Sequence, residues 1–214
     1  MSEQVTFALG IPTINRYDLL KPFLDKYLKF FPPHLIFVHD TGNLVPIYHN
    51  EPFLKVTRSD PASVAASWNA LCNMIFIKHT HAVILNDDLL LNKNGKQVES
   101  FIVLHKEQDF FVSQQEGFSS FIIPRKTFRT IGYFDENFKG AYFEDKDYER
   151  RMKLAGLQIM SASFLNPELH TRSASIGKDK KLNANYRHNA DYYSRKWGGN
   201  LGGETFTTPF NASQ

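Results

Sequence analysis

The sequence predicts a single α/β domain with a mixed, mostly parallel sheet flanked by helices. Short apolar runs alternate with stretches of helical periodicity through the first half of the chain. This alternation implies right-handed crossovers between parallel strands. No internal repeat or low-complexity linker interrupts the 214 residues, a length that fits one domain with a substantial core.

The first half of the chain supplies most of the predicted parallel strands. Residues 5–11 form an apolar run that is closed by Pro12, and Asp18 is expected to cap the helix that follows. Pro32 and Pro33 are expected to end that helix. Further strands are expected at residues 35–38, 53–57 and 82–85, and a loop and helix within residues 59–78.

The second half mixes short strands with charged helices. Strands are expected at residues 110–112, 118–123 and 157–160, and helices at residues 98–105, 124–131 and 142–156. In the last of these helices acids come first, bases follow and Gly156 ends the run, which is the order that a helix dipole favours. We expect the domain to cover residues 1–198, with a flexible C-terminal tail at residues 199–214.

Composition points to an ordinary soluble protein. Hydrophobic residues make up 42% and charged residues 22% of the chain, and the net charge of +3 is too small to require a polyanionic partner. A single cysteine, Cys72, excludes an internal disulfide and fits a reducing compartment. The sequence shows no signal peptide and no transmembrane segment, so a cytoplasmic location is expected.

Polar residues follow the apolar strand of residues 82–85 without a gap. Asn86, Asp87 and Asp88 stand where ligands collect in open α/β sheets. Two adjacent carboxylates repel each other unless a cation offsets their charge, and a divalent metal that also binds phosphate oxygens would do so. The alternative interpretation is a turn rich in Asn and Asp.

The order of several short motifs resembles that of family 2 glycosyltransferases with the GT-A fold. The resemblance runs from about residue 5 to residue 198, and each motif is weak when taken singly. The matching segments are Gly10–Arg16 at the first strand, His39–Gly42 at the second, Asn86–Asp88 as a variant DxD element, Gly132–Glu136, Glu144–Asp147, His170 and Lys196–Gly198.

The resemblance implies a nucleotide site at the strand ends. Asp40 would accept hydrogen bonds from the base, as the family's acid does with uracil, although Asp is also an ordinary turn former. Asp87 would contact the sugar or ribose. Asn69 matches an asparagine of the family, but Trp68 stands where a basic residue often precedes it. The residues implied to lie against the base and ribose are Pro12, Thr13, Asn15 and Arg16.

The resemblance also implies a metal site and a catalytic base. Asp88 would be a metal ligand with diphosphate, water and His170, and such oxygen-rich surroundings favour Mn²⁺ or Mg²⁺ over Zn²⁺. Asp145 would take the proton of the acceptor hydroxyl, with Glu144 beside it. For Asp147 and Glu149 the favoured interpretation is an acidic helix start.

The predicted function is therefore an inverting, metal-dependent glycosyltransferase that moves a hexosyl or pentosyl group. Its donor would be a nucleotide-diphosphate sugar, with UDP favoured through Asp40, and its hydroxyl acceptor would be a glycan, a lipid-linked sugar or a modified DNA base. A nucleotidyltransferase is an alternative, although the segment from Pro12 to Arg16 is not the Gly-rich basic loop that this class uses. A non-catalytic nucleotide-sugar binding module is another, because Asn86 lacks the first DxD acid.

Basic and aromatic residues interleave in residues 178–197. Such a pattern is one way to hold nucleic acid or a diphosphate. It is also typical of a solvated helix, which is the favoured interpretation.

Overall fold

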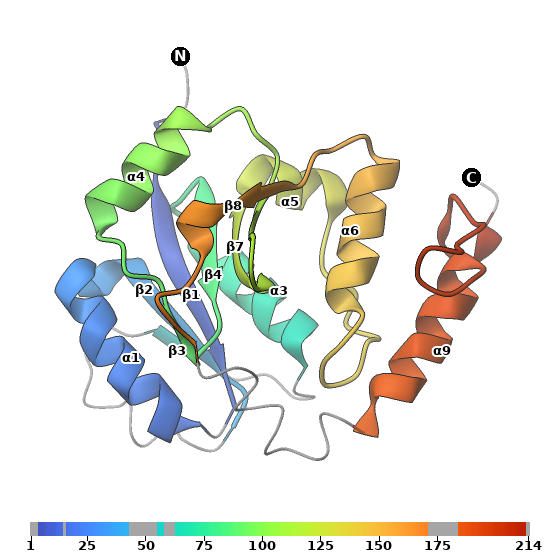
Figure 1. Ribbon diagram of the computed structural model, residues 1–214, viewed down its shortest axis with the longest axis horizontal. Helices are drawn as coiled ribbons and strands as arrows, with labels where there is room; N and C mark the ends of the chain where they lie inside the picture. The colour runs from blue at the N-terminus through green and yellow to red at the C-terminus, as the bar shows by residue number, and fades with distance from the viewer. Residues whose placement is uncertain (1–3, 15, 43–54, 58–62, 171–183, 213–214) are drawn as a thin grey trace.

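A seven-stranded sheet is the centre of the molecule. The computed structural model describes residues 4–14, 16–42, 55–57, 63–170 and 184–212. Within these residues the strand order is β3-β2-β1-β4-β7-β6-β8. Every neighbouring pair is parallel except the two that involve β7, which runs antiparallel to both β4 and β6. The predicted mixed, mostly parallel sheet flanked by helices is confirmed (Figure 1).

The elements occur close to the predicted positions. The strands of this sheet are β1 (Phe7–Thr13), β2 (Ile36–Asp40), β3 (Lys55–Thr57), β4 (His81–Leu85), β6 (Phe111–Ser113), β7 (Gly117–Pro124) and β8 (Met160–Ala162). The α-helices are α1 (Tyr17–Phe30), α3 (Val64–Ile75), α4 (Gly95–Leu104), α5 (Arg125–Ile131), α6 (Glu144–Leu154) and α9 (Tyr186–Trp197). Short 3-10 turns are η1 (Pro33–Leu35), η2 (Ser163–Leu165) and η3 (Pro209–Asn211).

Alternating side chains of the strands build a core on each face of the sheet. On β1, Leu9 packs with α1 and α4, whereas its neighbour Ala8 packs with α3, α5 and α6. Successive side chains of a strand point to opposite faces, so one apolar run fills both cores. Figure 1 shows the same division, with α1 and α4 on one side of the sheet and α3, α5 and α6 on the other.

A second, two-stranded sheet was not predicted. β5 (Leu89–Leu90) pairs antiparallel with β9 (Leu169–His170), and Leu89 lies opposite His170. Two strands of two residues each carry too little periodicity to be recognised in a sequence. Their pairing brings His170 to the segment that follows β4.

Two helix starts differ from the prediction. Asp18 does not cap α1: the N-cap is Arg16, and Asp18 lies in the first turn, where its carboxylate pairs with the Arg16 guanidinium at 2.9 Å. α4 begins at Gly95, three residues earlier than expected, because Asn94 and Gln97 form a capping box. The strand expected at residues 157–160 is also displaced, since β8 covers Met160–Ala162.

The C-terminal helix is not the solvated helix that the sequence favoured. In α9 the residues Asn189, Tyr193, Lys196 and Trp197 are buried, at the spacing of one helix face. Residues 199–212 fold back onto it, and the N–H groups of Thr205 and Phe206 both donate to the carbonyl oxygen of Trp197. Whether a tail is flexible beyond residue 198 stays a prediction.

No helix among the described residues is long and apolar enough to cross a bilayer.

Candidate active site

A cavity of about 430 Å³ opens at the carboxyl ends of the central strands. One wall is formed by Pro12 and Thr13 at the end of β1 and by Asp87 after β4. The opposite wall carries Glu144 and Asp145, the first two residues of α6. The structure thus brings five of the predicted site residues, from three distant segments, around one space.

Thr13 and Asp87 are joined directly. The Thr13 hydroxyl donates a hydrogen bond to Oδ2 of Asp87 at 2.7 Å, and both side chains are buried. β1 and β4 are parallel neighbours, so their carboxyl ends lie side by side. This contact holds the Asp87 carboxylate at the cavity wall.

Asp40 lies next to this wall and not on it. Its Cα is the register partner of Thr13, and its side chain is fully buried. One carboxylate oxygen accepts from the N–H of Gly42 at 2.8 Å, while Oδ2 has no hydrogen-bond partner. Arg16 is also off the wall, where it pairs with Asp18. The predicted residue Asn15 lies outside the described residues.

The structure does not bring Asn69 to the cavity. Its side-chain nitrogen donates to the carbonyl of Phe134 at 2.9 Å and to Glu136 at 2.8 Å, and its oxygen accepts from the N–H of Phe134. Asn69 therefore anchors the turn at residues 132–136 to α3. Its neighbour Trp68 lines the cavity instead, and the Trp68 indole N–H is buried without a partner.

Asp88 and His170 lie together, as the resemblance implied. Nε2 of His170 is 3.5 Å from Oδ1 of Asp88, and its Nδ1 is 3.2 Å from Oε2 of Glu116. Glu116 lines the cavity and was not singled out in the sequence. Among the described residues no three His, Cys, Asp or Glu side chains are grouped so that they alone could hold a metal ion. A carboxylate and an imidazole fit a divalent cation that takes its remaining ligands from a bound diphosphate and water.

A buried tyrosine fixes the backbone beside Asp88. The Tyr27 hydroxyl, from α1, donates to the carbonyl of Leu89 at 2.5 Å and accepts from the N–H of Leu91 at 3.3 Å. Tyr27 is fully buried. A tyrosine at helical spacing in α1 gave no sign of this role, because the contact spans 62 residues.

The two acids of α6 share a water-poor wall. Glu144 is 6% exposed, and Oε2 of its carboxyl group has no hydrogen-bond partner. Burial and the neighbouring Asp145 raise the pKa of Glu144 to about 8. Burial also raises the pKa of Asp145, while Lys146 opposes the shift. Two adjacent acids with raised pKa values, facing a cavity, are the pattern of proton-transfer chemistry.

An unusual backbone delivers these acids to the cavity. Tyr142 and Phe143, directly before Glu144, have φ angles of +83° and +73°. This left-handed region is disfavoured for residues with a side chain. Strain of this kind persists only where the surroundings hold the backbone in place.

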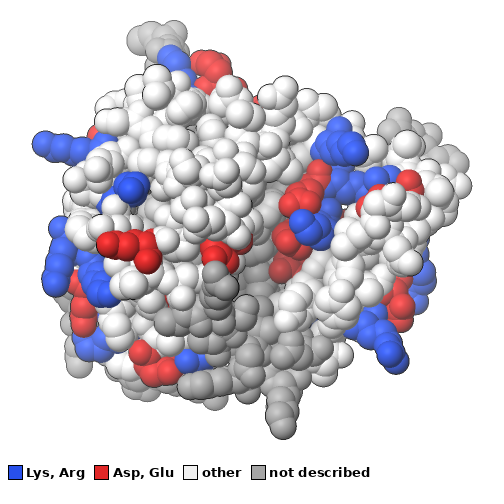
Figure 2. All heavy atoms as spheres, viewed as in Figure 1, with Lys and Arg blue, Asp and Glu red and all other residues white. Residues whose placement is uncertain are grey.

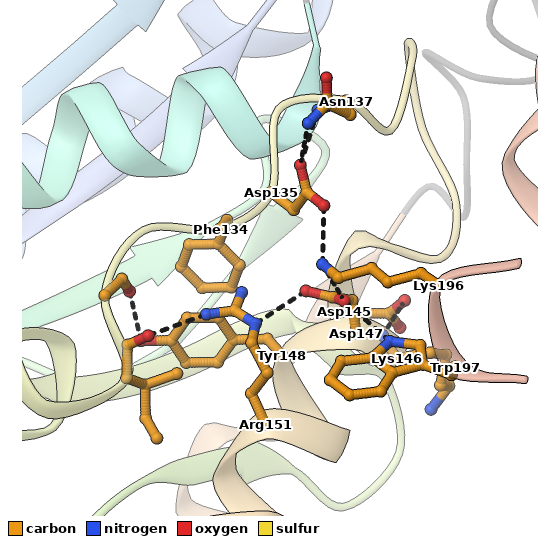
Figure 3. Close-up of polar contacts among 12 residues, drawn as sticks. Phe134, Asp135, Asn137, Asp145, Lys146, Asp147, Tyr148, Arg151, Lys196 and Trp197 are labelled. Atoms are coloured by element: carbon orange, nitrogen blue, oxygen red, sulfur yellow. Dashed lines mark hydrogen bonds and ion pairs between the residues drawn. The ribbon is translucent and has the colours of Figure 1, made fainter. Parts of the chain in front are cut away.

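Asp147 is structural, as predicted, but for a different physical reason. It is fully buried, and its carboxylate accepts from the Trp197 indole and from Arg151 and pairs with Lys196. Lys196 also donates to Asp135 at 2.7 Å, so one lysine bridges two acids (Figure 3). The residue belongs to a buried network that joins α6 and α9, and not to a solvated helix start.

Charge on the visible face is mixed. Figure 2 shows Lys and Arg side chains interspersed with Asp and Glu, without one broad basic surface. This distribution agrees with the small net charge of +3.

Comparison with solved structures identifies the fold. The chain matches S. aureus TarS 1-349 in complex with UDP at a TM-score of 0.57 and 16% identity, covering 74% of this chain and 58% of that one. It matches the mannosyltransferase PcManGT from Pyrobaculum calidifontis, in complex with GDP-Man and Mn²⁺, at a TM-score of 0.59 and 12% identity. This match covers 78% of this chain and 57% of that one. It also matches GalNAc-T7 with UDP, GalNAc and Mn²⁺ at a TM-score of 0.59 and 12% identity, covering 77% of this chain and 43% of that one.

These likenesses establish a GT-A fold for this chain, as the sequence motifs implied. The chain spans between 43% and 58% of the lengths of these three structures. No protein-family model matches the sequence, and no curated protein does.

Proposed function

We propose that this protein is an inverting glycosyltransferase that uses a nucleotide-diphosphate sugar. The observation that carries the proposal is the cavity shared by Asp87 and Thr13, at the strand ends, and by Glu144 and Asp145, at the start of α6. The first pair stands where sheets of this kind bind nucleotides, and the second supplies two carboxyl groups that line the same cavity. The fold it shares with nucleotide-sugar complexes supports the same class.

The donor would lie across the strand ends. Pro12 and Thr13 would contact the nucleoside, whereas Asp40, which is fully buried and does not line the cavity, is not assigned a contact with the base. Asp88 and His170 would hold Mn²⁺ or Mg²⁺ together with the diphosphate. When bound, the cation supplies Lewis-acid stabilisation of the departing diphosphate.

Asp145 is the proposed base. As the acceptor oxygen bonds to the anomeric carbon, its proton passes to the Asp145 carboxylate, and the electrons of the breaking C–O bond leave with the diphosphate. Attack from the face opposite the leaving group inverts the configuration. Glu144, with its pKa near 8, is largely protonated at neutral pH and so can donate a hydrogen bond to the acceptor.

The cavity residues beside Glu144 and Asp145 favour an acceptor substrate with an uncharged ring. Tyr142 and Tyr186 line the cavity beside the acids, with ring centroids 5.3 Å apart, and aromatic faces pack well against sugar rings. Among the described lining residues the acids are Asp87, Glu116, Glu144 and Asp145, and the single cation is Lys146. Even with Glu144 protonated, three acids stand against one lysine, and this excess of negative charge favours a glycan or lipid-linked sugar over a base in DNA.

A thermal-shift panel tests the proposal. UDP, GDP, CMP, ADP and dTDP are each measured with Mn²⁺ and with a chelator. A ligand at 100 times its Kd should stabilise the fold by about 2.7 kcal/mol. We expect one nucleotide to raise the melting temperature only with Mn²⁺, and the matching sugar donor to be turned over. No shift with any nucleotide would overturn the nucleotide site, and binding without turnover would leave a binding module.

A further inference from the structure

Asn189 of α9 makes its contacts with the loop that carries the acids. Its side chain is fully buried. The amide nitrogen lies 2.9–3.0 Å from the carbonyl oxygens of Lys139, Ala141 and Tyr142, and its oxygen accepts from the N–H of Lys139 at 2.9 Å. One side chain, 50 residues away in the sequence, thus hydrogen-bonds both N–H and carbonyl groups of this loop.

The loop needs an external clamp. Its last two residues, Tyr142 and Phe143, are left-handed and come directly before Glu144. On the other side, the carbonyl of Gly140 accepts from the N–H of Val64 at the start of α3, at 2.8 Å. The loop is therefore held between α3 and Asn189, and the two acids take their position from it.

Side chains of α9 other than Asn189 also hold this helix against the domain. Tyr193 and Trp197 are buried further along the same helix face, and Lys196 pairs with Asp135 and Asp147. These contacts reach the turn at residues 132–136 and α6, as Figure 3 shows for Lys196. Tyr193 also packs against the ring of Phe143, so it contacts a side chain of the loop, whereas Asn189 hydrogen-bonds the loop backbone.

We propose that Asn189 is a positioning residue, whose amide sets the loop at residues 139–143 and so aims the carboxyl groups of Glu144 and Asp145 into the cavity. Its catalytic consequence rests on the proposed glycosyltransferase function. An asparagine suits this place because the site requires a neutral group that both donates and accepts. A carboxylate of the same size would face three carbonyl oxygens without a proton to offer.

The test uses Asn189→Asp and the matched control Tyr193→Phe in the full chain. The control lies on the same helix and loses one hydrogen bond, from the Tyr193 hydroxyl to Glu204 at 2.6 Å, without touching the loop backbone. Three quantities are compared: UDP release from UDP-GlcNAc with Mn²⁺, the Kd of UDP with Mn²⁺, and amide hydrogen exchange of residues 140–146.

We expect Asn189→Asp to slow UDP release about 10- to 100-fold, since a misplacement near 1 Å costs about that much. The Kd of UDP should stay within about twofold of wild type, as for distant independent sites. Exchange at residues 140–146 should rise in this variant and not in Tyr193→Phe. Lowering the pH should bring exchange at residues 140–146 of this variant closer to that of wild type at the same pH, because the introduced carboxyl group can donate one hydrogen bond once it is protonated.

Equal exchange at residues 140–146 in Asn189→Asp and wild type would overturn the inference, and so would equal losses of activity in both variants. Absence of UDP release from the wild type with UDP-GlcNAc would count against the proposed function for that donor. The exchange measurement still decides the role of Asn189 in that case.

Discussion

At the scale of single residues, the presence or absence of hydrogen-bond partners separates the buried acids of α6 by role. Asp147 and Glu144 are both buried, yet Asp147 is surrounded by donors and Glu144 has an unpartnered oxygen at the cavity. A carboxylate that is fully paired serves the fold, whereas one that is desolvated and left open suits chemistry. The sequence Glu144-Asp-Lys-Asp147 alone does not contain this distinction.

Asp145→Asn should abolish glycosyl transfer, with a loss of at least about 10²-fold, because a general base contributes about 10²–10⁴. The amide keeps the size of the side chain but cannot take a proton. The Kd of UDP with Mn²⁺, from calorimetry, should change little. Glu149→Gln on the same helix is the control, since Glu149 only pairs with Lys146. Persistent activity in Asp145→Asn would place the base elsewhere.

Glu144 makes the fold less stable as the pH rises. Its pKa is raised from 4.5 to about 8 in the folded state, so the folded state binds more protons than the unfolded state between these values. The free energy of unfolding should therefore fall as the pH goes from about 5 to about 8. Asp145, whose pKa is also raised, adds to this slope.

Glu144→Gln should remove part of this dependence. We expect it to raise the free energy of unfolding at pH 8 by about 1–3 kcal/mol, the usual cost of a buried unpaired polar group. Below about pH 4 wild type and variant should be equally stable, because the acid is then mostly neutral in both states. Urea unfolding at several pH values measures this, and parallel curves for the two proteins would contradict it.

At the scale of elements, two of the helices that line the cavity, α6 and α9, are joined by a buried ion network. Lys196 of α9 pairs with Asp135 and with Asp147 of α6, and only 6% of the Lys196 side chain is exposed. The pKa of Asp135 is lowered because hydrogen bonds from Lys196 and Asn137 outweigh its burial. Removing the lysine would leave Asp135 without this cation and Asp147 with Arg151 as its remaining cation.

Lys196→Met should lower the free energy of unfolding by about 3–5 kcal/mol, as expected when one partner of a buried ion pair is lost. The matched control is Lys21→Met on α1, where the lysine pairs with Asp25 and both side chains are about half exposed. That change should cost less than about 1 kcal/mol. Urea denaturation compares them, and equal losses would show that the network contributes no more than a surface pair.

The β5–β9 pairing gives a second prediction at this scale. His170→Ala and Asp88→Ala should each weaken UDP binding in the presence of Mn²⁺, by about 10-fold or more if each is a ligand. Binding in the presence of a chelator should be equal in wild type and both variants. Calorimetry distinguishes this from a structural effect, because a merely distorted site would weaken binding with and without the metal.

For the molecule as a whole, the question is where the domain ends. Residues 199–212 contact α9 and α6, and the Arg150 side chain donates to the carbonyl of Phe206. Deleting residues 199–214 should therefore cost about 1–3 kcal/mol through lost partners of buried groups. Deleting residues 213–214 is the control. Equal melting temperatures for both would support a flexible tail beginning at residue 199.

Local patterns in the chain were enough to predict the sheet, most helix positions and the segments at the strand ends. Apolar periodicity and proline act locally, so β1, β2, β4 and α3 could be predicted within a few residues. The acids at residues 87, 88, 144 and 145 could be proposed as site residues because each lies in a short motif, and three of them, Asp87, Glu144 and Asp145, line the cavity. The GT-A fold followed from the order of those motifs.

The long-range packing of the chain settles which polar groups reach the cavity and which stabilise the fold. Asn69 was expected at the nucleotide and instead anchors Phe134, while Glu116 and Trp68 line the cavity. Asn189 reaches the loop across 50 residues, and Tyr27 reaches Leu89 across 62. Such contacts depend on how distant segments pack, and a side chain carries no local mark of the partner it meets.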